Sequence, residues 1–336
     1  DPNIKYEFVF KKVNPHNEDS LLQFSILSYP AGSTDEFGRP KPALTVTSEV
    51  ASQNSLQIID NGTKLDPAVA IAFSSQTRDK NVVGHIAMVL DTSGSMANNM
   101  NGNSGGESRL SILKNRATAL IDGFAMEDNI DISLIPFASS ANNPYPFYNS
   151  STNANTLRNI ISGLSAVGGT NTGDGLRRAY HRLAIKNAEI GPHIRSSNYV
   201  IVLVDGVTTF ASVISNNNRD FVRGDGNVNE GFLDRGGLIS PDAQIAGNGS
   251  FLDPVGTRYV EEMGKLLSSN SFSRVYVIGF SSIQSELASV NDIAAACAAP
   301  PERVFWANSA NALTQVFEEI RQDIVNDLWY LQGPRL

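Results

Sequence analysis

The feature that most limits how this chain can fold is a short apolar run that ends in a carboxylate and two hydroxyls. Residues 85–90 read His-Ile-Ala-Met-Val-Leu, and Asp91, Ser93 and Ser95 follow at a spacing of two. A buried strand would deliver these side chains into one tight turn, where Gly94 lets the backbone curl so that all three can point inward. Oxygen ligands of this kind suit Mg²⁺, Ca²⁺ or Mn²⁺, whereas Zn²⁺ prefers nitrogen and sulfur. Because hydroxyls carry no charge, such a site leaves a divalent ion able to attract a further anionic ligand.

Two more polar residues stand in a matching context. Thr170 belongs to the sequence Gly-Gly-Thr-Asn-Thr, which precedes an amphipathic stretch at 175–186, so it is expected in a loop at a helix N-terminus. Asp205 directly follows a second apolar run, residues 199–204. Open α/β sheets bind ligands at the carboxyl ends of their strands, where both aspartates are expected to stand. A simple Ser/Asp turn that caps the next segment would explain the first motif, but it would leave Thr170 and Asp205 unexplained.

These three separated motifs resemble the von Willebrand factor type A (VWA) family, whose metal-ion-dependent adhesion site (MIDAS) has this pattern. The resemblance covers about residues 82–326. It implies one divalent-cation site, for Mg²⁺ (or Ca²⁺ or Mn²⁺), with ligands from all three motifs: Asp91, Ser93, Ser95, Thr170 and Asp205. It also implies that the hydroxyls bind the ion directly or through water, and that the two aspartates act mostly through water. One coordination position would stay open for an Asp or Glu of a partner.

The order of apolar patterns predicts the fold class. From residue 81 onward, strand-like runs alternate with helical patterns, which predicts a doubly wound α/β fold with a mainly parallel sheet. The expected strands are 84–90, 130–137, 199–204, 275–280 and 303–306, and the expected helices are 109–124, 156–164, 175–186, 257–267, 286–298 and 310–323. Residues 1–80 instead show short runs rich in Val, Ile, Phe and Thr between turn signals, at 6–13, 21–28, 43–50, 56–59 and 69–73. They predict a β-rich accessory region.

The predicted domain organisation follows from these patterns. Residues 1–80 form the accessory region, residues 81–326 the VWA domain, and residues 327–336 a C-terminal tail. The VWA domain carries a long polar insertion at about 207–255, which is expected to flank the metal, as is the polar stretch 97–108. Long loops are usually functional or disordered. Within the insertion, residues 225–231 resemble a calcium loop, but Glu230 stands where an EF-hand requires glycine.

Composition excludes some classes of partner. The net charge of −8 argues against nucleic acid, whose phosphates need a basic face. No stretch approaches the ~18 apolar residues of a membrane helix. The chain begins at Asp1-Pro2 without Met, so we expect a processed or truncated product in which membrane attachment came only through a missing N-terminal segment. The lone cysteine, Cys297, lies in an apolar stretch and is expected to be a buried small residue rather than a reactive thiol.

Sequence patterns that look catalytic lack the context that catalysis needs. Residues 102–106 fit Gly-x-Ser-x-Gly, but a polar loop precedes them where a nucleophile elbow requires a strand. The four histidines show no metal-binding spacing. His85 is expected in the core or at a sheet edge, and His181 on the surface of a helix. We therefore expect a binding protein and not an enzyme.

Three stretches, residues 91–96, 168–176 and 304–324, resemble bacterial pilus-associated VWA proteins, in particular the TadG-like proteins of tight-adherence (Tad) pili. The resemblance implies a secreted minor pilin or pilus component at the cell surface that mediates adhesion or assembly. The acidic partner would be a pilin subunit or a host surface protein, and movement of the last helix, 310–323, could couple to Thr170. Two alternatives stay open. One is an intracellular VWA scaffold that works with an AAA+ ATPase, and the other is an enzyme that uses the ion as a Lewis acid.

Overall fold

The computed structural model describes most of the chain. Side chains are described for residues 82–141, 144–191, 194–214, 220–224 and 244–328, except at 288 and 326, where only the backbone is described. Backbone alone is described for the strands of residues 4–64 and 232–240 that are named below. The predicted strand at 69–73, the calcium-like loop at 225–231 and residues 329–336 of the predicted tail lie outside the described residues.

The chain divides into two compact units, Asp1–Asp79 with Tyr330–Leu336, and Lys80–Trp329. The first unit is β-rich, as its runs of Val, Ile, Phe and Thr predict. Its three longer strands form an antiparallel sheet in the order β1-β2-β3. Two short strands form a separate antiparallel pair. The strands are β1 (Ile4–Lys12), β2 (Leu22–Pro30), β3 (Leu44–Val50), β4 (Ile59–Asp60) and β5 (Thr63–Lys64).

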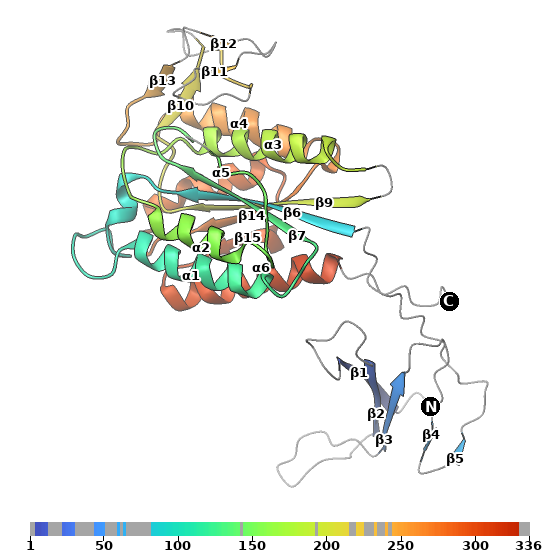
Figure 1. The fold of residues 1–336 in the computed structure, drawn as a ribbon. Helices are drawn as coiled ribbons and strands as arrows, with labels where there is room; N and C mark the ends of the chain where they lie inside the picture. The colour runs from blue at the N-terminus through green and yellow to red at the C-terminus, as the bar shows by residue number, and fades with distance from the viewer. Residues whose placement is uncertain are drawn as a thin grey trace. The chain divides into compact units, whose positions relative to one another are not determined.

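The second unit is built on one sheet with strand order β15-β14-β9-β6-β7-β8 (Figure 1). All neighbouring strands are parallel except the antiparallel pair β7 and β8. The strands are β6 (Val82–Asp91), β7 (Ile130–Phe137), β8 (Tyr148–Asn149), β9 (Arg195–Val204), β14 (Arg274–Gly279) and β15 (Val304–Trp306). The predicted doubly wound, mainly parallel fold is therefore confirmed.

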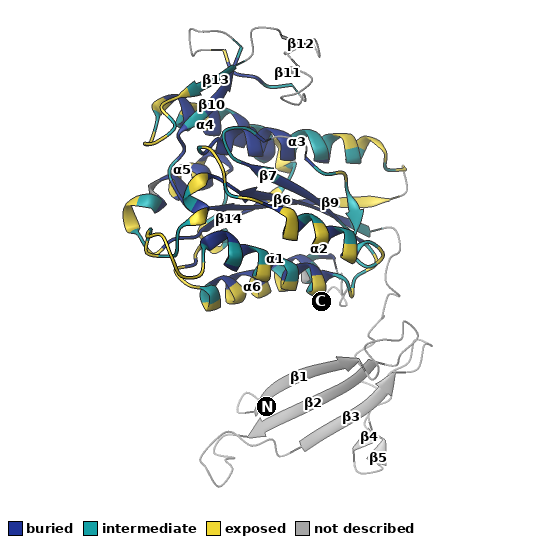
Figure 2. Ribbon diagram, turned by 60° about the vertical axis from the view of Figure 1, so that its left-hand side comes forward, coloured by how far each residue is buried: buried dark blue, intermediate teal, exposed yellow. Residues whose placement is uncertain are grey.

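Helices cover both faces of this sheet, which explains why its central strands read as continuous apolar runs. One face packs on α1 (Arg109–Phe124), α2 (Ala154–Gly163) and α6 (Ala310–Leu328), and the other on α3 (Thr172–Ala188), α4 (Pro254–Ser268) and α5 (Ala288–Ala296) (Figure 1). Along β6, Ile86 and Met88 point to the first layer and Ala87 and Val89 to the second. Figure 2 shows the sheet buried between these layers. None of the helices that the structure describes is long and apolar enough to cross a membrane.

Four helices, α2, α3, α4 and α6, extend beyond their predicted bounds, and packing explains the extensions of α3 and α6. α3 begins at Thr172 instead of residue 175. Gly173 and Gly175 are poor helix formers, but both lie inside the helix because the lack of a side chain lets neighbouring residues pack closely against it. A Cβ at Gly173 would lie 2.5 Å from Tyr259 Cδ1, and one at Gly175 would lie 2.7 Å from Val89 Cγ1.

α6 continues to Leu328, past the predicted end at 323. Ile320, Ile324 and Leu328 keep the four-residue spacing of its buried stripe. Gly84 makes room for Leu328, whose Cδ1 would lie 2.7 Å from a Cβ at that position. The predicted helix 286–298 is instead a 3₁₀ turn, η4 (Gln284–Leu287), followed by α5.

The insertion at 207–255 contains secondary structure that its polar sequence did not predict. β10 (Phe210–Val213) pairs antiparallel with β13 (Gln244–Gly247). A second short pair is formed by β11 (Phe232–Leu233) and β12 (Ile239–Ser240). The insertion is therefore not a plain loop, and its base is a hairpin anchored next to α3 and α4, as described below.

Candidate metal centre

Two neighbouring strands bring the two predicted aspartates to the same edge of the sheet. Asp91 is the last residue of β6, and Asp205 directly follows β9. Leu90 pairs with Leu203 in the parallel register, so both carboxylates leave the sheet at the carboxyl ends of adjacent strands that lie about 4.8 Å apart. This is the position at which sheets of this class bind ligands.

The two serines complete a connected cluster with these carboxylates. Ser93 and Ser95 lie in the turn that enters η2 (Gly94–Ala97). The Ser95 hydroxyl donates to Asp205 Oδ1 over 2.8 Å, and the two serine Oγ atoms lie 3.0 Å apart. The Ser93 backbone N–H donates to Asp91 Oδ1 over 2.8 Å. The structure thus joins four of the five predicted residues by hydrogen bonds.

Thr170, the fifth predicted residue, lies in a loop that packs against the serine turn. Gly94 N–H donates to the Gly168 carbonyl over 2.8 Å, which joins the turn to this loop. Thr170 is buried, and its carbonyl accepts hydrogen bonds from the N–H groups of Thr209 and Phe210. Its own N–H donates to Thr209 Oγ1 over 2.9 Å. Thr170 therefore stands between the serine turn and the start of the insertion.

The electrostatics of the cluster are those of a site that lacks positive charge. Burial raises the pKa of Asp91 to about 8, and the negative charge of Asp205 adds to the rise. Burial also raises the pKa of Asp205, although the Arg109 guanidinium opposes the rise. Among the described residues, Asp91 Oδ2 is a buried oxygen without a hydrogen-bond partner. A buried oxygen of this kind is costly unless something pairs with it, and a cation would do so.

A buried arginine sits behind the cluster, and the sequence reasoning missed it. Arg109 Nη1 donates to Asp205 Oδ2 over 2.9 Å. Its Nη2 donates to Glu286 Oε2 over 2.7 Å and to Ser281 Oγ over 3.1 Å. The Arg109 side chain is fully buried, whereas that of Glu286 is 29% exposed. One signal was available: Arg109 is the first residue of α1, where a cation opposes the helix dipole, so it needs a fixed acidic partner.

The donor set fits a hard divalent cation. Two carboxylates and two hydroxyls suit Mg²⁺, Ca²⁺ or Mn²⁺. Within the described part of the chain, no group of three or more His, Cys, Asp or Glu residues could hold a metal. A metal held by these residues therefore depends on the hydroxyls as well as on Asp91 and Asp205.

The insertion is fixed beside the site by a second buried ion pair. Asp174 accepts hydrogen bonds from Ser212 of β10 over 3.1 Å and from the Ala141 N–H over 2.6 Å. Arg177 pairs with the same carboxylate at 2.8 Å, and both side chains are fully buried. Burial alone would raise the pKa of Asp174, but Arg177 and the Ala141 N–H lower it below its usual range. The base of the insertion therefore rests on an ionised, fixed carboxylate.

Other predicted residues behave as follows. His85 is buried in the core, as expected, and burial lowers its pKa. Cys297 is also buried, as expected, and burial raises its thiol pKa to about 12. His181, expected on the surface of a helix, lies in α3, where it is partly exposed and its ring bonds to the Arg223 carbonyl. The Gly-x-Ser-x-Gly match lies in an exposed loop, which leaves Ser104 without the elbow geometry.

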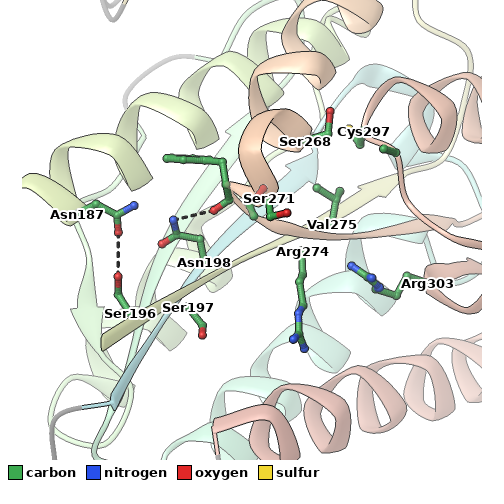
Figure 3. Close-up of a pocket in the computed structure, with 13 residues that line it drawn as sticks. Asn187, Ser196, Ser197, Asn198, Ser268, Ser271, Arg274, Val275, Cys297 and Arg303 are labelled. Atoms are coloured by element: carbon green, nitrogen blue, oxygen red, sulfur yellow. Dashed lines mark hydrogen bonds between the residues drawn. The ribbon is translucent and has the colours of Figure 1, made fainter. Parts of the chain in front are cut away.

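A polar cavity of about 720 Å³ lies elsewhere, at the amino ends of β9 and β14 (Figure 3). Its lining includes Ser196, Asn198, Arg274 and, at the end of α5, Cys297. Asn198 is seven residues before Asp205 in an extended strand, a separation of about 23 Å. None of the predicted metal residues is among those that line it. The cavity is therefore separate from the metal centre.

Residues 86–207 match the von Willebrand factor type A domain family, and all five predicted metal residues lie inside this range. This region is a VWA domain. The family commonly binds a divalent metal at its MIDAS. No curated protein sequence matches the chain.

Solved structures show the same fold over nearly the whole chain. The PilB minor pilin from Streptococcus sanguinis aligns with a TM-score of 0.63 at 22% identity, covering 98% of this chain and 80% of PilB. The pilus adhesin SpaC from Lactobacillus rhamnosus GG aligns with a TM-score of 0.51 at 16% identity, covering 97% of this chain but 35% of SpaC. At these identities the comparison establishes a shared fold.

Proposed function

We propose that this protein is a metal-dependent adhesion or assembly component of a bacterial surface pilus. It binds a divalent cation, Mg²⁺ (or Ca²⁺ or Mn²⁺), through Asp91, Ser93, Ser95, Thr170 and Asp205, and it captures an acidic side chain of a protein partner. The observation that carries the proposal is the buried cluster of hydroxyls and carboxylates, in which Asp91 Oδ2 has no hydrogen-bond partner among the described residues. The fold shared with a minor pilin and a pilus adhesin supports a location on a pilus.

Arg109 explains why such a site would take an acidic partner. Its guanidinium occupies Asp205 Oδ2 and offsets the charge of that carboxylate. Asp91 and the serine hydroxyls then supply less negative charge than a divalent cation carries. When bound, the cation supplies electrostatic attraction for an anionic ligand, and charge-assisted bonds in partly buried surroundings are strong.

The same geometry favours binding over catalysis. The Ser95 hydroxyl donates to Asp205, and that carboxylate is itself paired with Arg109. Burial raises the pKa of Asp205, but the Arg109 guanidinium opposes the rise and so makes this carboxylate a weaker general base for Ser95. We propose a protein partner, either another pilin subunit or a host surface protein, and a location at the cell surface. The narrower assignment to tight-adherence pili rests on the sequence resemblance at 91–96, 168–176 and 304–324.

The test is metal-dependent binding of a short fluorescent peptide with one Glu among Gly and Ser residues. We expect binding to the full chain in Mg²⁺, loss of binding in EDTA, and loss when Gln replaces the Glu of the peptide. Asp205→Ala and Ser93→Ala should abolish binding, whereas Asp122→Ala should not, because Asp122 forms an exposed pair with Arg158. Equal binding of the Glu and Gln peptides, or full binding in EDTA, would contradict the proposal.

A further inference from the structure

Three large apolar side chains are exposed on loops at the edge of the sheet that carries the metal residues. Phe251 is 75% exposed and Leu252 is 45% exposed, and both lie in the connection between β13 and α4. Val167 is 59% exposed and lies in the loop that leads to Thr170. We call these three residues the apolar rim. Exposed apolar surface beside polar residues is typical of interaction sites.

Backbone contacts tie the Val167 side of the rim to the metal turn. The Val167 N–H donates to the Thr92 carbonyl over 2.9 Å. Thr92 lies between Asp91 and Ser93 in the sequence, so Val167 is one hydrogen bond away from the candidate ligands. The next residue, Gly168, accepts a hydrogen bond from the Gly94 N–H.

The Phe251 side of the rim is joined to the same loop through Phe210. The Phe210 ring lies between two glycines: a Cβ at Gly169 would be 2.5 Å from its Cε2, and one at Gly249 would be 2.7 Å from its Cζ. The Asp253 N–H also donates to the Thr208 carbonyl over 3.0 Å, three residues after Asp205. The rim therefore borders the candidate metal site from both the Thr170 loop and the insertion.

The loop that presents Phe251 is held by its own hydrogen bonds. Asn248 Oδ1 accepts from the N–H groups of Ser250 and Phe251 over 2.8 and 2.6 Å. Asn248 Nδ2 donates to Asp253 Oδ2 over 2.9 Å. Gly249 supplies the positive φ, 76°, that the turn requires. Because these bonds fix the backbone that carries Phe251 in advance, less conformational entropy is lost in ordering the loop when a partner binds.

We propose that the apolar rim binds a hydrophobic side chain that lies close in sequence to the acidic residue of the partner. The proposal rests on the function proposed above, because the acidic residue engages the metal while the rim contacts its neighbour. The partner is then a protein segment in which an aromatic or large aliphatic residue accompanies Asp or Glu. The charge of the cation selects a carboxylate, and the apolar rim then selects among acidic segments. A buried aromatic anchor contributes most of the binding energy in many interfaces.

The test compares short peptides of one Glu in a Gly/Ser background with the same peptides carrying a single Phe at each position on either side of the Glu. In Mg²⁺, at least one Phe position should tighten binding to the full chain about tenfold, from ring burial and an aromatic contact. Phe251→Ser should remove this gain and leave binding of the Glu-only peptide unchanged. Met126→Ser is the matched control, because Met126 is 60% exposed and follows α1, before β7 begins.

Each outcome separates the two proposals. If the Glu-only peptide does not bind in Mg²⁺, the proposed function fails and this inference with it. If the Glu-only peptide binds but no Phe position improves it, only the apolar rim is refuted. A gain that survives Phe251→Ser, Leu252→Ser and Val167→Ser, or that persists in EDTA, would also refute it. A wild-type dimer that Phe251→Ser converts to a monomer would overturn the proposal too, because a second copy would then cover the rim.

Discussion

Replacing Arg109 with methionine would show whether the buried guanidinium and a bound cation stabilise the same carboxylate, that of Asp205. The change keeps most of the buried aliphatic volume but removes the guanidinium that pairs with Asp205 and Glu286. Asp205 then loses its buried cationic partner. Removing one member of a buried ion pair typically costs about 3–5 kcal/mol, because the remaining charge is left buried and unpaired.

The expected loss of folding stability is large, but the variant should remain folded, since the free energy of unfolding of a domain is about 5–15 kcal/mol. For a unit of this size, the loss corresponds to a fall in melting temperature of about 6–20 °C. In saturating Mg²⁺ the fall should be smaller, because the cation supplies positive charge beside Asp205 and stabilises the folded state by mass action. Thermal and urea denaturation, each with Mg²⁺ and with EDTA, measure the effect.

Arg158→Met is the matched control, because Arg158 pairs with Asp122 at the surface, where an ion pair is worth about 0–1 kcal/mol. Combining Arg109→Met with Asp205→Asn should recover part of the loss, because the uncompensated carboxylate is gone. The reasoning is refuted if Arg109→Met is no more harmful than Arg158→Met, or if Mg²⁺ protects the variant less than it protects the wild type.

Three further predictions follow from individual side chains. Because burial and Asp205 raise the pKa of Asp91 to about 8, the folded, metal-free protein keeps a proton that the unfolded chain releases above about pH 4. Its contribution to stability is therefore full below about pH 4 and is lost as the pH rises to about 8. The midpoints of urea denaturation should fall over this pH range in the wild type, but less in Asp91→Asn. The affinity for Mg²⁺ should rise about tenfold per pH unit over the same range, because binding displaces the proton. Midpoints and an affinity that do not change with pH would contradict this prediction. Gly173→Ala should destabilise the fold by about 1–3 kcal/mol, because the new methyl group would lie 2.5 Å from Tyr259 Cδ1. Gly163→Ala, where a methyl group meets open space, should instead stabilise it by about 0.4–1 kcal/mol. Similar melting temperatures for the two variants would be inconsistent with the packing described. Cys297, buried with a pKa raised to about 12, should react with an aromatic disulfide reagent only at the rate of unfolding, and faster labelling in native buffer would show that the thiol is accessible.

The sequence predicted those parts of the fold that depend on a single local pattern. α1 and β7 begin and end where their apolar spacing predicts, at 109–124 and 130–137. Both aspartates were placed correctly at strand ends, because a buried strand followed by an acid is visible in one short window. α3 was predicted too short, since the reason for Gly173 is Tyr259, a residue far away in the sequence.

The parts that could not be predicted depend on contacts between distant segments. Arg109 and Glu286 meet across 177 residues of sequence, and no local pattern pairs them. The hairpin of β10 and β13 lies in a polar insertion without clear alternation, and Ser212 joins it to Asp174. The position of the loop that carries Phe251 depends in part on the packing of Gly249 against Phe210, a residue much earlier in the sequence.

The central claim is that Asp91, Ser93, Ser95 and Asp205, with Thr170 beside them, hold one divalent cation. Mn²⁺ titration followed by electron paramagnetic resonance tests it most directly, because the signal of free Mn²⁺ falls as the ion binds. We expect a single site in the wild type and in Asp122→Ala, and its loss in both Asp205→Ala and Ser93→Ala, with melting temperatures in EDTA confirming that the variants are folded. Unchanged Mn²⁺ binding in folded Asp205→Ala and Ser93→Ala would contradict the account.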